Sequence, residues 1–237
     1  MGLPNQTDQN RWKKAAAEEA VKLVRGGMVV GLGTGTTAEF FLVALSQRIA
    51  EEGLRISGIP TSEGTSAQAR RLNIPLTTFS EHLEIDLTVD GADEVEPETL
   101  FLIKGHGGAL LREKIIASSS RQMTVITDES KLVNKLGSHV TVPVEVVSFG
   151  WEATEEKLRK MDAKPSLRLG KDKMPFITDS GNYILDCAFG PMESPEDVAE
   201  HLDHIIGVVE HGLFLGIASQ ILVGGPHGVK TLQQTRK

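Results

Sequence analysis

The sequence predicts an α/β protein with a mostly parallel sheet, helices on both faces of that sheet, and a smaller inserted α+β lobe. Short apolar strands alternate with helical segments over the first 130 residues, which is typical of a parallel sheet. Polar turns follow these strands, at the edge where such sheets bind ligands. After residue 131, strands joined by turns stand beside two helices. We therefore expect a Rossmann-like main domain over residues 1–130 and 207–237, and the lobe over residues 131–206.

The individual elements follow from apolar patterns and their end signals. Gly26 and Gly27 end the first helix, and Ser194 with Pro195 opens the last one. Helices are expected over residues 10–25, 38–50, 66–72 and 152–161, in the segment that carries Glu113, and from residue 195 onward. Strands are expected over residues 28–32, 54–59, 85–89 and 122–126, over 140–147 with a break at Pro143, on both sides of a turn at 180–182, and over 213–223, which returns to the main sheet.

The turn after the first strand, residues 31–37 (GLGTGTT), has the features of an anion site. A strand, a glycine turn and a helix together direct backbone N–H groups and the positive helix end at a ligand. Thr36 with Glu39 fits a capping box. The turn lacks both the third glycine of a dinucleotide fingerprint and the lysine of a Walker loop. Phosphate or a sugar hydroxyl is therefore the expected ligand.

Four ionisable residues gather near a later strand end. Asp90 ends the predicted strand, Asp93 follows it, Lys104 precedes a glycine-rich turn, and Glu113 lies on the next helix. Taken singly, an acid there is commonly a turn former, a helix cap or part of a solvated helix face. Taken together beside a glycine turn, three acids and a lysine suit proton transfer on a small polar substrate.

Composition limits the possible partners and cofactors. A net charge of −7 and a pI near 5.5 disfavour nucleic acid as the main partner. No apolar run is long enough to span a membrane, and the N-terminus lacks the apolar core of a signal peptide. The single cysteine, Cys187, favours a cytoplasmic protein without disulfides. His201 and His204 lie three residues apart, but no third ligand has suitable spacing, so neither a metal nor another cofactor is expected.

Four motifs, in order and at nearly the same spacing, resemble the type A ribose-5-phosphate isomerase family. They are GTGTTA at 33–38, DGADE at 90–94, KGHGGAL at 104–110 followed by REK at 112–114, and DESK at 128–131. The likeness covers almost the whole chain, including the lobe and the EHGLF stretch at 210–214. It implies a metal-independent aldose–ketose isomerase that interconverts D-ribose 5-phosphate and D-ribulose 5-phosphate through an enediolate. The family belongs to the non-oxidative pentose phosphate pathway and forms homodimers or homotetramers.

The resemblance also implies residue roles. Glu113 is the base that moves a proton between C1 and C2, while Asp90, Asp93 and Lys104 help to open the furanose ring and hold the sugar oxygens. The expected substrate-binding residues are Lys13, Thr34, Gly35, Thr36, Thr37, Gly91, Ala92, Gly105, His106, Gly107 and Lys131. His106 departs from the family, which more often has glycine there. A side chain at this position is expected to crowd the pocket or to require an unusual backbone angle.

Two alternative functions remain compatible with the residues. A non-catalytic sugar-phosphate sensor would keep the anion turn but has no need for Glu113 beside Lys104. It would usually carry a DNA-binding domain, for which the first 25 or so residues are too short. A different sugar-phosphate enzyme on a similar sheet, such as a lactonase or an amino-sugar deaminase, is the second alternative.

Overall fold

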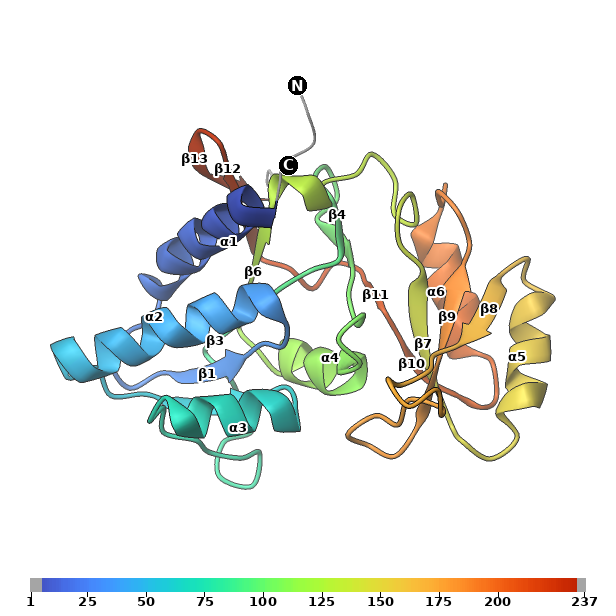
Figure 1. The fold of residues 1–237 in the computed structure, drawn as a ribbon, viewed down its shortest axis with the longest axis horizontal. Coiled ribbons are helices and arrows are strands. Elements are labelled where there is room, and N and C mark those ends of the chain that lie inside the picture. The colour runs from blue at the N-terminus through green and yellow to red at the C-terminus, as the bar shows by residue number, and fades with distance from the viewer. Residues whose placement is uncertain (1–5, 234–237) are drawn as a thin grey trace.

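The computed structural model describes residues 6–233, and within them the strands form three sheets (Figure 1). The largest sheet has the order β13-β12-β6-β3-β1-β2. Its strands are β1 (Val29–Leu32), β2 (Ser57–Pro60), β3 (Leu87–Asp90), β6 (Met123–Asp128), β12 (Gln220–Gly225) and β13 (Gly228–Gln233). All neighbours pair in parallel except β12 and β13, which pair antiparallel. The prediction of a mostly parallel sheet is confirmed.

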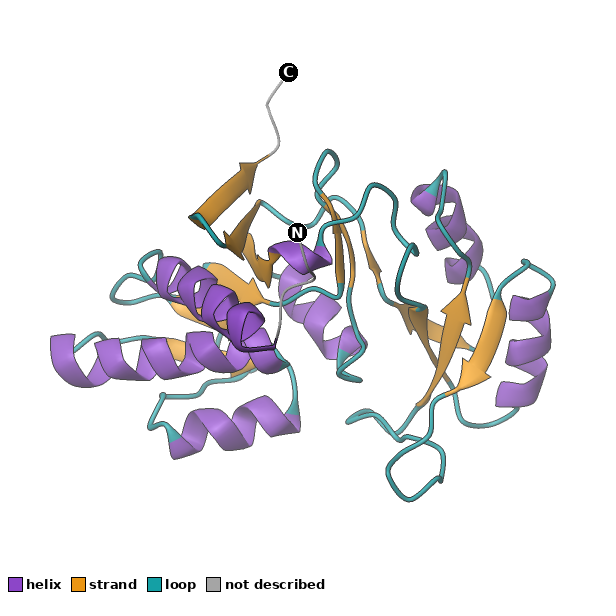
Figure 2. Cartoon of the chain, turned by 45° about the horizontal axis from the view of Figure 1, so that its top comes forward, coloured by secondary structure: helices purple, strands orange, loops and turns teal. Residues whose placement is uncertain are grey.

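Helices cover both faces of this sheet. They are α1 (Gln6–Val21), α2 (Thr36–Glu52), α3 (Glu63–Arg71) and α4 (Leu110–Ser118). Because side chains alternate along a strand, β1 presents Val30 to the core cluster that includes Phe41 of α2, and Val29 to a cluster that includes Ile116 of α4. The two faces of one strand therefore pack against different helices. Figure 2 shows the helices, in purple, around the orange strands of this part of the chain.

A second, antiparallel sheet forms the lobe, seen at the right of Figure 1. Its order is β10-β7-β9-β8, with β7 (Val142–Val146), β8 (Lys164–Leu167), β9 (Tyr183–Ala188) and β10 (Val208–His211). Helices α5 (Trp151–Arg159) and α6 (Pro195–Asp203) accompany it. Leu158 of α5 and Leu202 of α6 share one core cluster with Val144 and Leu185 of the sheet. The lobe thus has a hydrophobic core, which also includes Ile103 and Leu213 of a small third sheet.

The third sheet, β11-β5-β4, was not predicted. It consists of β4 (Glu94–Glu96), β5 (Phe101–Ile103) and β11 (Leu213–Phe214). Strands of two or three residues are too short to show an alternating pattern. The expected single strand over 213–223 is correspondingly wrong, because β11 joins this small sheet and only β12 returns to the main one.

Three local predictions are also wrong. Pro143 does not break β7. Proline lacks an N–H group, but at this position β7 faces Gly212, just beyond the end of β10, and needs to donate no ladder hydrogen bond there. The Pro143 carbonyl still accepts the Gly212 N–H. Strands β8 and β9 do pair, but residues 168–182 separate them rather than a short turn. Helix α2 begins at Thr36 after Gly35, with no side-chain cap, so the capping box is absent.

No helix within residues 6–233 combines the length and the apolarity needed to cross a membrane.

Candidate active site

A pocket of about 110 Å³ opens where β1, β3 and β6 end. It brings together residues that are far apart in the sequence, from the first helix to the turn after β6. Its lining residues are Lys13, Thr34, Gly35, Thr36, Thr37, Gly91, Ala92, Asp93, Lys104, Gly105, Gly107, Glu113 and Lys131. Of the residues expected at the site, only Asp90 and His106 are not part of this lining.

A buried charge cluster forms the floor of the pocket. The Lys104 ammonium lies 2.9 Å from Asp90 Oδ2 and 3.4 Å from Glu113 Oε1, and it donates to the Gly91 carbonyl at 2.7 Å. Lys104, Asp90 and Glu113 are only 2%, 0% and 4% exposed. A buried charge is tolerated when it is paired and hydrogen-bonded, and Lys104 has partners on three sides. Two carboxylates, however, share one ammonium.

This imbalance sets the protonation of the cluster. Burial opposes the charge of Lys104, but the carboxylates of Asp90 and Glu113 outweigh it and raise the lysine pKa above its ordinary value. For Glu113, burial and the nearby Asp90 carboxylate raise the pKa to about 8, although Lys104 opposes the shift. Glu113 Oε2 is buried and has no hydrogen-bond partner among residues 6–233. A carboxylate with a raised pKa is a stronger base than an exposed one.

Asp90 fixes the shape of the neighbouring glycine turn. Its Oδ1 accepts the N–H groups of Thr34 at 3.0 Å and Gly91 at 2.8 Å. A Cβ atom at position 33 would lie 2.3 Å from Oδ1, so only glycine allows the carboxylate to come this close. Asp90 therefore acts on the pocket from beneath, through Lys104 and through the turn.

The threonines of the turn differ in the contacts that they make within the protein. The Thr34 hydroxyl lies 2.7 Å from that of Thr61, 2.9 Å from Ser62 Oγ and 3.0 Å from that of Thr65. This hydroxyl cluster ties the turn to the start of α3 and leaves Thr34 little capacity for a ligand. Thr36 and Thr37 form the first positions of α2, where N–H groups lack intrahelical acceptors. The open donors of the turn are thus backbone groups at the positive helix end.

Two lysines line the pocket from different elements. Lys13 belongs to α1, and its ammonium lies 3.9 Å from Asp128 Oδ2 at the end of β6. Lys131 ends the short 3-10 helix that follows β6. Helix α1 sits closely on β12, because a Cβ at Gly224 would lie 2.0 Å from the Trp12 carbonyl. The lining of one pocket therefore includes two cations and a helix N-terminus, which is the donor set that a phosphate group requires.

His106 does not have the effect expected from the sequence. Its side chain is exposed, and its ring Nε2 lies 3.0 Å from the Thr141 carbonyl, at the edge of the lobe. The positive φ angles of this turn belong to Gly105 (+105°) and Gly108 (+82°), not to His106. The expectation of a crowded pocket or an unusual backbone angle is wrong, because the ring turns away from the lining.

Two residues that contact the site were not anticipated individually. The Phe214 ring lies beneath the ammonium of Lys104, 5.4 Å from the ring centroid, and also contacts that of Lys114 at 4.9 Å. Its only sequence signal was its membership of the EHGLF stretch. Arg168, from the lobe, donates to the carbonyls of Gly105 at 3.0 Å and His106 at 3.1 Å. No sequence pattern pointed to it.

One cluster outside the pocket has the composition of a metal site. Ligand atoms of Asp203, Glu210 and His211 lie within 4.8 Å of one another. His211 Nδ1 accepts the Leu213 N–H at 3.2 Å, so Nε2 carries the proton of the neutral ring and faces Asp203 Oδ1 at 3.2 Å. The Lys114 ammonium lies 2.5 Å from Glu210 Oε1. With no free ring nitrogen and a cation already in place, these residues do not fit a metal ion.

His201 and His204 are also engaged by the protein itself. Each Nδ1 lies 2.6 Å from a carbonyl one turn earlier, that of Asp197 and that of Glu200 respectively. These contacts within the last helix give both rings a local role at the exposed helix surface.

Comparison with known proteins gives a consistent result. The family model for ribose 5-phosphate isomerase A (phosphoriboisomerase A) matches residues 57–228. Ribose-5-phosphate isomerase A of Gluconobacter oxydans is 53% identical over 227 residues, which cover 94% of this chain and 97% of that protein. The structure of ribose 5-phosphate isomerase A from Methanocaldococcus jannaschii has a TM-score of 0.91 and 44% identity, covering 94% of this chain and 99% of that one. A D-ribose-5-phosphate isomerase in complex with phospho-erythronic acid has a TM-score of 0.92 and 41% identity, covering 95% and 99%.

Proposed function

The chain belongs to the ribose 5-phosphate isomerase A family and is an aldose–ketose isomerase that interconverts D-ribose 5-phosphate and D-ribulose 5-phosphate, and we propose that Glu113 is its catalytic base. The observation that carries this proposal is the buried, unpartnered Oε2 of Glu113 in the lining of the pocket. A single carboxylate can take the proton from C2 of the aldose and return it to C1 of the ketose.

The proton transfer passes through an enediolate, whose negative charge has to be stabilised. Lys104 is the candidate, because the surrounding carboxylates keep its pKa above the ordinary value and its ammonium therefore stays charged. Asp93, which lines the pocket, is suited to hold a sugar hydroxyl during ring opening. Asp90 is more deeply buried and would act by holding Lys104 in place.

The phosphate of the substrate would bind at the start of α2. Lys13 and Lys131 supply charge, and the backbone of Gly35, Thr36 and Thr37 supplies N–H donors. Gly91, Ala92, Gly105 and Gly107 leave room for the sugar chain between the phosphate and Glu113. Because the phosphate does not react, its binding energy would serve to position the sugar.

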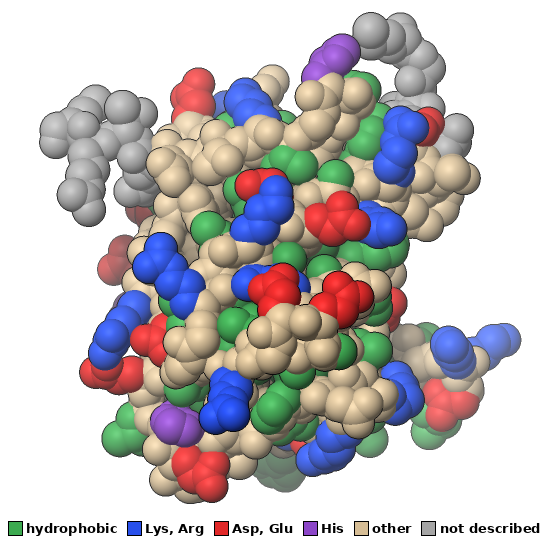
Figure 3. All heavy atoms as spheres, turned by 90° about the vertical axis from the view of Figure 1, so that its left-hand side faces the viewer, with side chains coloured by type: hydrophobic (Ala, Val, Ile, Leu, Met, Phe, Trp, Pro, Cys, Tyr) green, Lys and Arg blue, Asp and Glu red, His purple; other side chains and the backbone are tan. Residues whose placement is uncertain are grey.

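The remaining features of the proposal concern the setting of the enzyme. We propose a cytoplasmic homodimer or homotetramer that needs no metal or cofactor and does not bind nucleic acid. Interspersed basic and acidic side chains on the face shown in Figure 3 support the last point, since phosphate backbones favour continuous basic surfaces. We also propose residues 1–130 with 207–237 and residues 131–206 as the two domains. Light scattering after size-exclusion chromatography would measure the oligomeric state.

A substrate panel tests the function directly. Purified protein should convert ribose 5-phosphate to a ketose and should be far less active on six-carbon phosphates, lactones and amino-sugar phosphates. In D₂O, the proton-transfer mechanism predicts deuterium incorporation at C2 of recovered ribose 5-phosphate. Dialysis against a strong chelator should leave the rate unchanged. Binding without turnover would instead indicate the sensor, and loss on chelation with recovery on adding one divalent ion would indicate a metal enzyme.

A further inference from the structure

The glycine turn beside Lys104 is held from outside the main domain. The Arg168 guanidinium donates through one nitrogen to the carbonyls of Gly105 at 3.0 Å and His106 at 3.1 Å. Arg168 directly follows β8 of the lobe. The same guanidinium forms a two-pronged ion pair with Asp186 of β9, whose Oδ2 lies 2.9 Å from its Nε. One lobe arginine therefore contacts two consecutive peptide groups of the active-site turn.

The geometry of a trans peptide gives these contacts a direction. The C=O and N–H groups of one peptide point opposite ways, and none of the peptides in residues 6–233 is cis. The Gly105 carbonyl faces Arg168, and the N–H of the same peptide, on His106, donates to Asp93 Oδ2 at 3.1 Å. The His106 carbonyl also faces Arg168, so the N–H of the next peptide, on Gly107, points away from it. That N–H has no partner within residues 6–233.

We propose that Arg168 is a positioning residue for the isomerisation, which orients the Gly107 N–H as a donor to the developing enediolate oxygen. The inference rests on the proposed function. Gly107 lines the same pocket as Lys104 and Glu113. A cation on the carbonyl side also polarises the peptide and strengthens its N–H as a donor.

The setting of Arg168 fits a positioning role better than a surface ion pair. Its side chain is 13% exposed and that of Asp186 is 24% exposed. Its backbone is fixed as well, since its N–H donates to the Ile184 carbonyl at 2.9 Å and its own carbonyl accepts the Phe176 N–H at 2.9 Å. Arg168 is thus fixed at its backbone by these two hydrogen bonds and at its guanidinium by Asp186. Lysine cannot reproduce the planar fork that serves Asp186 and the turn together.

Arg168→Lys tests the proposal with three measurements. The turnover number kcat for ribose 5-phosphate should fall about ten- to a hundred-fold, as for loss of a charge-assisted contact, while KM changes little. Phospho-erythronic acid carries a carboxylate where the enediolate would form, so its affinity should fall in parallel with kcat. Inorganic phosphate, as a competitive inhibitor, should bind as it does to the wild type.

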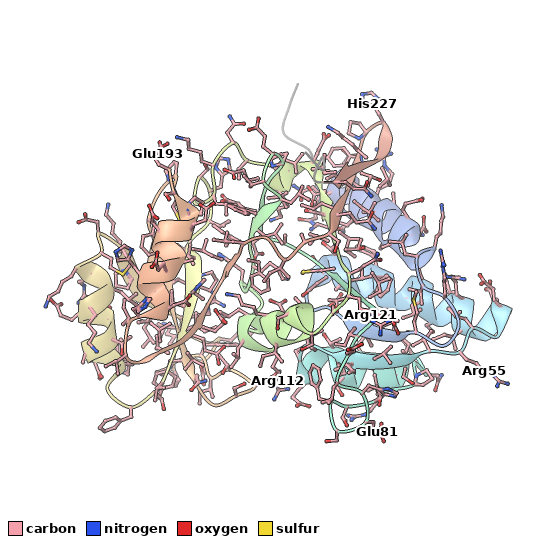
Figure 4. All side chains as sticks on the ribbon, turned by 180° about the vertical axis from the view of Figure 1, so that it is seen from behind. Arg55, Glu81, Arg112, Arg121, Glu193 and His227 are labelled. Atoms are coloured by element: carbon pink, nitrogen blue, oxygen red, sulfur yellow. The ribbon has the colours of Figure 1, made fainter. Side chains whose placement is uncertain are left out.

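Arg112→Gln is the matched control. Arg112, labelled on α4 in Figure 4, links the main domain to the lobe by donating to the Asp179 carbonyl at 2.9 Å and to Glu63 at 2.9 Å. Its loss weakens a contact with the lobe without touching the glycine turn. Its kcat and its affinity for phospho-erythronic acid should stay close to those of the wild type, whatever happens to its melting temperature.

Three results would overturn the proposal: an unchanged kcat in Arg168→Lys, equal loss of affinity for phosphate and phospho-erythronic acid, or the same loss of kcat in Arg112→Gln. If Arg168→Lys does not fold, Asp186→Asn applies the same criteria, because it removes the charge that orients Arg168 and keeps an acceptor. Wild-type protein that binds phospho-erythronic acid but has no isomerase activity would contradict the proposed function instead. The difference in affinity between wild type and variant would still test Arg168.

Discussion

Two glycine turns meet at the pocket, and they are held by different parts of the molecule. The turn at residues 33–37 is fixed within the main domain, by Asp90 and by the hydroxyl cluster around Thr34. The turn at residues 105–108 is held from the main domain by Asp93, which accepts the His106 N–H, and from the lobe by Arg168 and by the contact of His106 with Thr141. In the proposed binding mode the first turn holds the phosphate and the second lies at the reacting carbons, so the two ends of the site have different supports, with Asp90 in contact with both the first turn and Lys104. Binding and chemistry should therefore respond to different substitutions.

The lysines of the two ends also differ, in how deeply they are buried and how closely they are paired. Lys104 is 2% exposed and lies among two carboxylates and a carbonyl. The Lys13 side chain is 12% exposed, and its ammonium is 3.9 Å from its carboxylate partner. A fully enclosed cation acts on charge that develops beside it, whereas a loosely paired cation can exchange its partner for a ligand.

The largest effect should come from Glu113→Gln. Glutamine keeps the shape of the side chain but removes its basicity, so kcat should fall by about 10²-fold or more while KM changes little. Steady-state kinetics with ribose 5-phosphate, together with inorganic phosphate as a competitive inhibitor, would measure both ends of the site. Near-normal turnover in this variant would remove Glu113 from the mechanism. Loss of phosphate binding would contradict the separation of the two ends.

A smaller effect, confined to the phosphate end, is expected from Lys131→Ala. Loss of one charge-assisted contact should lower kcat/KM for ribose 5-phosphate about ten- to a hundred-fold. The residual rate with free ribose should barely change, because that substrate has no phosphate. Equal loss on both substrates would show that Lys131 contacts the sugar or supports the fold, and the phosphate would then depend on Lys13 and the α2 N-terminus.

The features predicted from sequence are those encoded in consecutive residues. The strand, glycine turn and helix at 28–50 form one local pattern. The spacing of Asp90, Lys104 and Glu113 follows from the lengths of the strands and the helix around the second glycine turn, at residues 105–108. The two supports of the turns were not predictable in this way. Thr34 meets its hydroxyl partners from 27 to 31 residues away, and Arg168 reaches Gly105 across 63 residues. Such contacts depend on tertiary packing, which leaves no periodic signal in the sequence.

The smallest expected effect is a pH-dependent difference in stability between the wild type and Glu113→Gln. Burial raises the pKa of Glu113 from its ordinary 4.5 to about 8 in the folded protein. Between these values the folded state holds a proton that the unfolded chain has released, so stability falls as pH rises through this window. Glutamine has no such proton. The wild-type melting temperature, relative to that of Glu113→Gln, should therefore decline from pH 5 to pH 9.

Scanning calorimetry at several pH values would measure this difference, with Glu98→Gln as the control for removing one exposed carboxylate. Lys104 does not reverse the trend, because its raised pKa adds the same stability at every pH below the ordinary lysine value of 10.5. If the difference in melting temperature between wild type and Glu113→Gln stayed constant from pH 5 to pH 9, Glu113 would have the same pKa in the folded and unfolded chains. The buried cluster would then not strengthen Glu113 as a base, and a carboxylate of ordinary pKa would depend on stabilisation of the enediolate by Lys104 and the glycine turn.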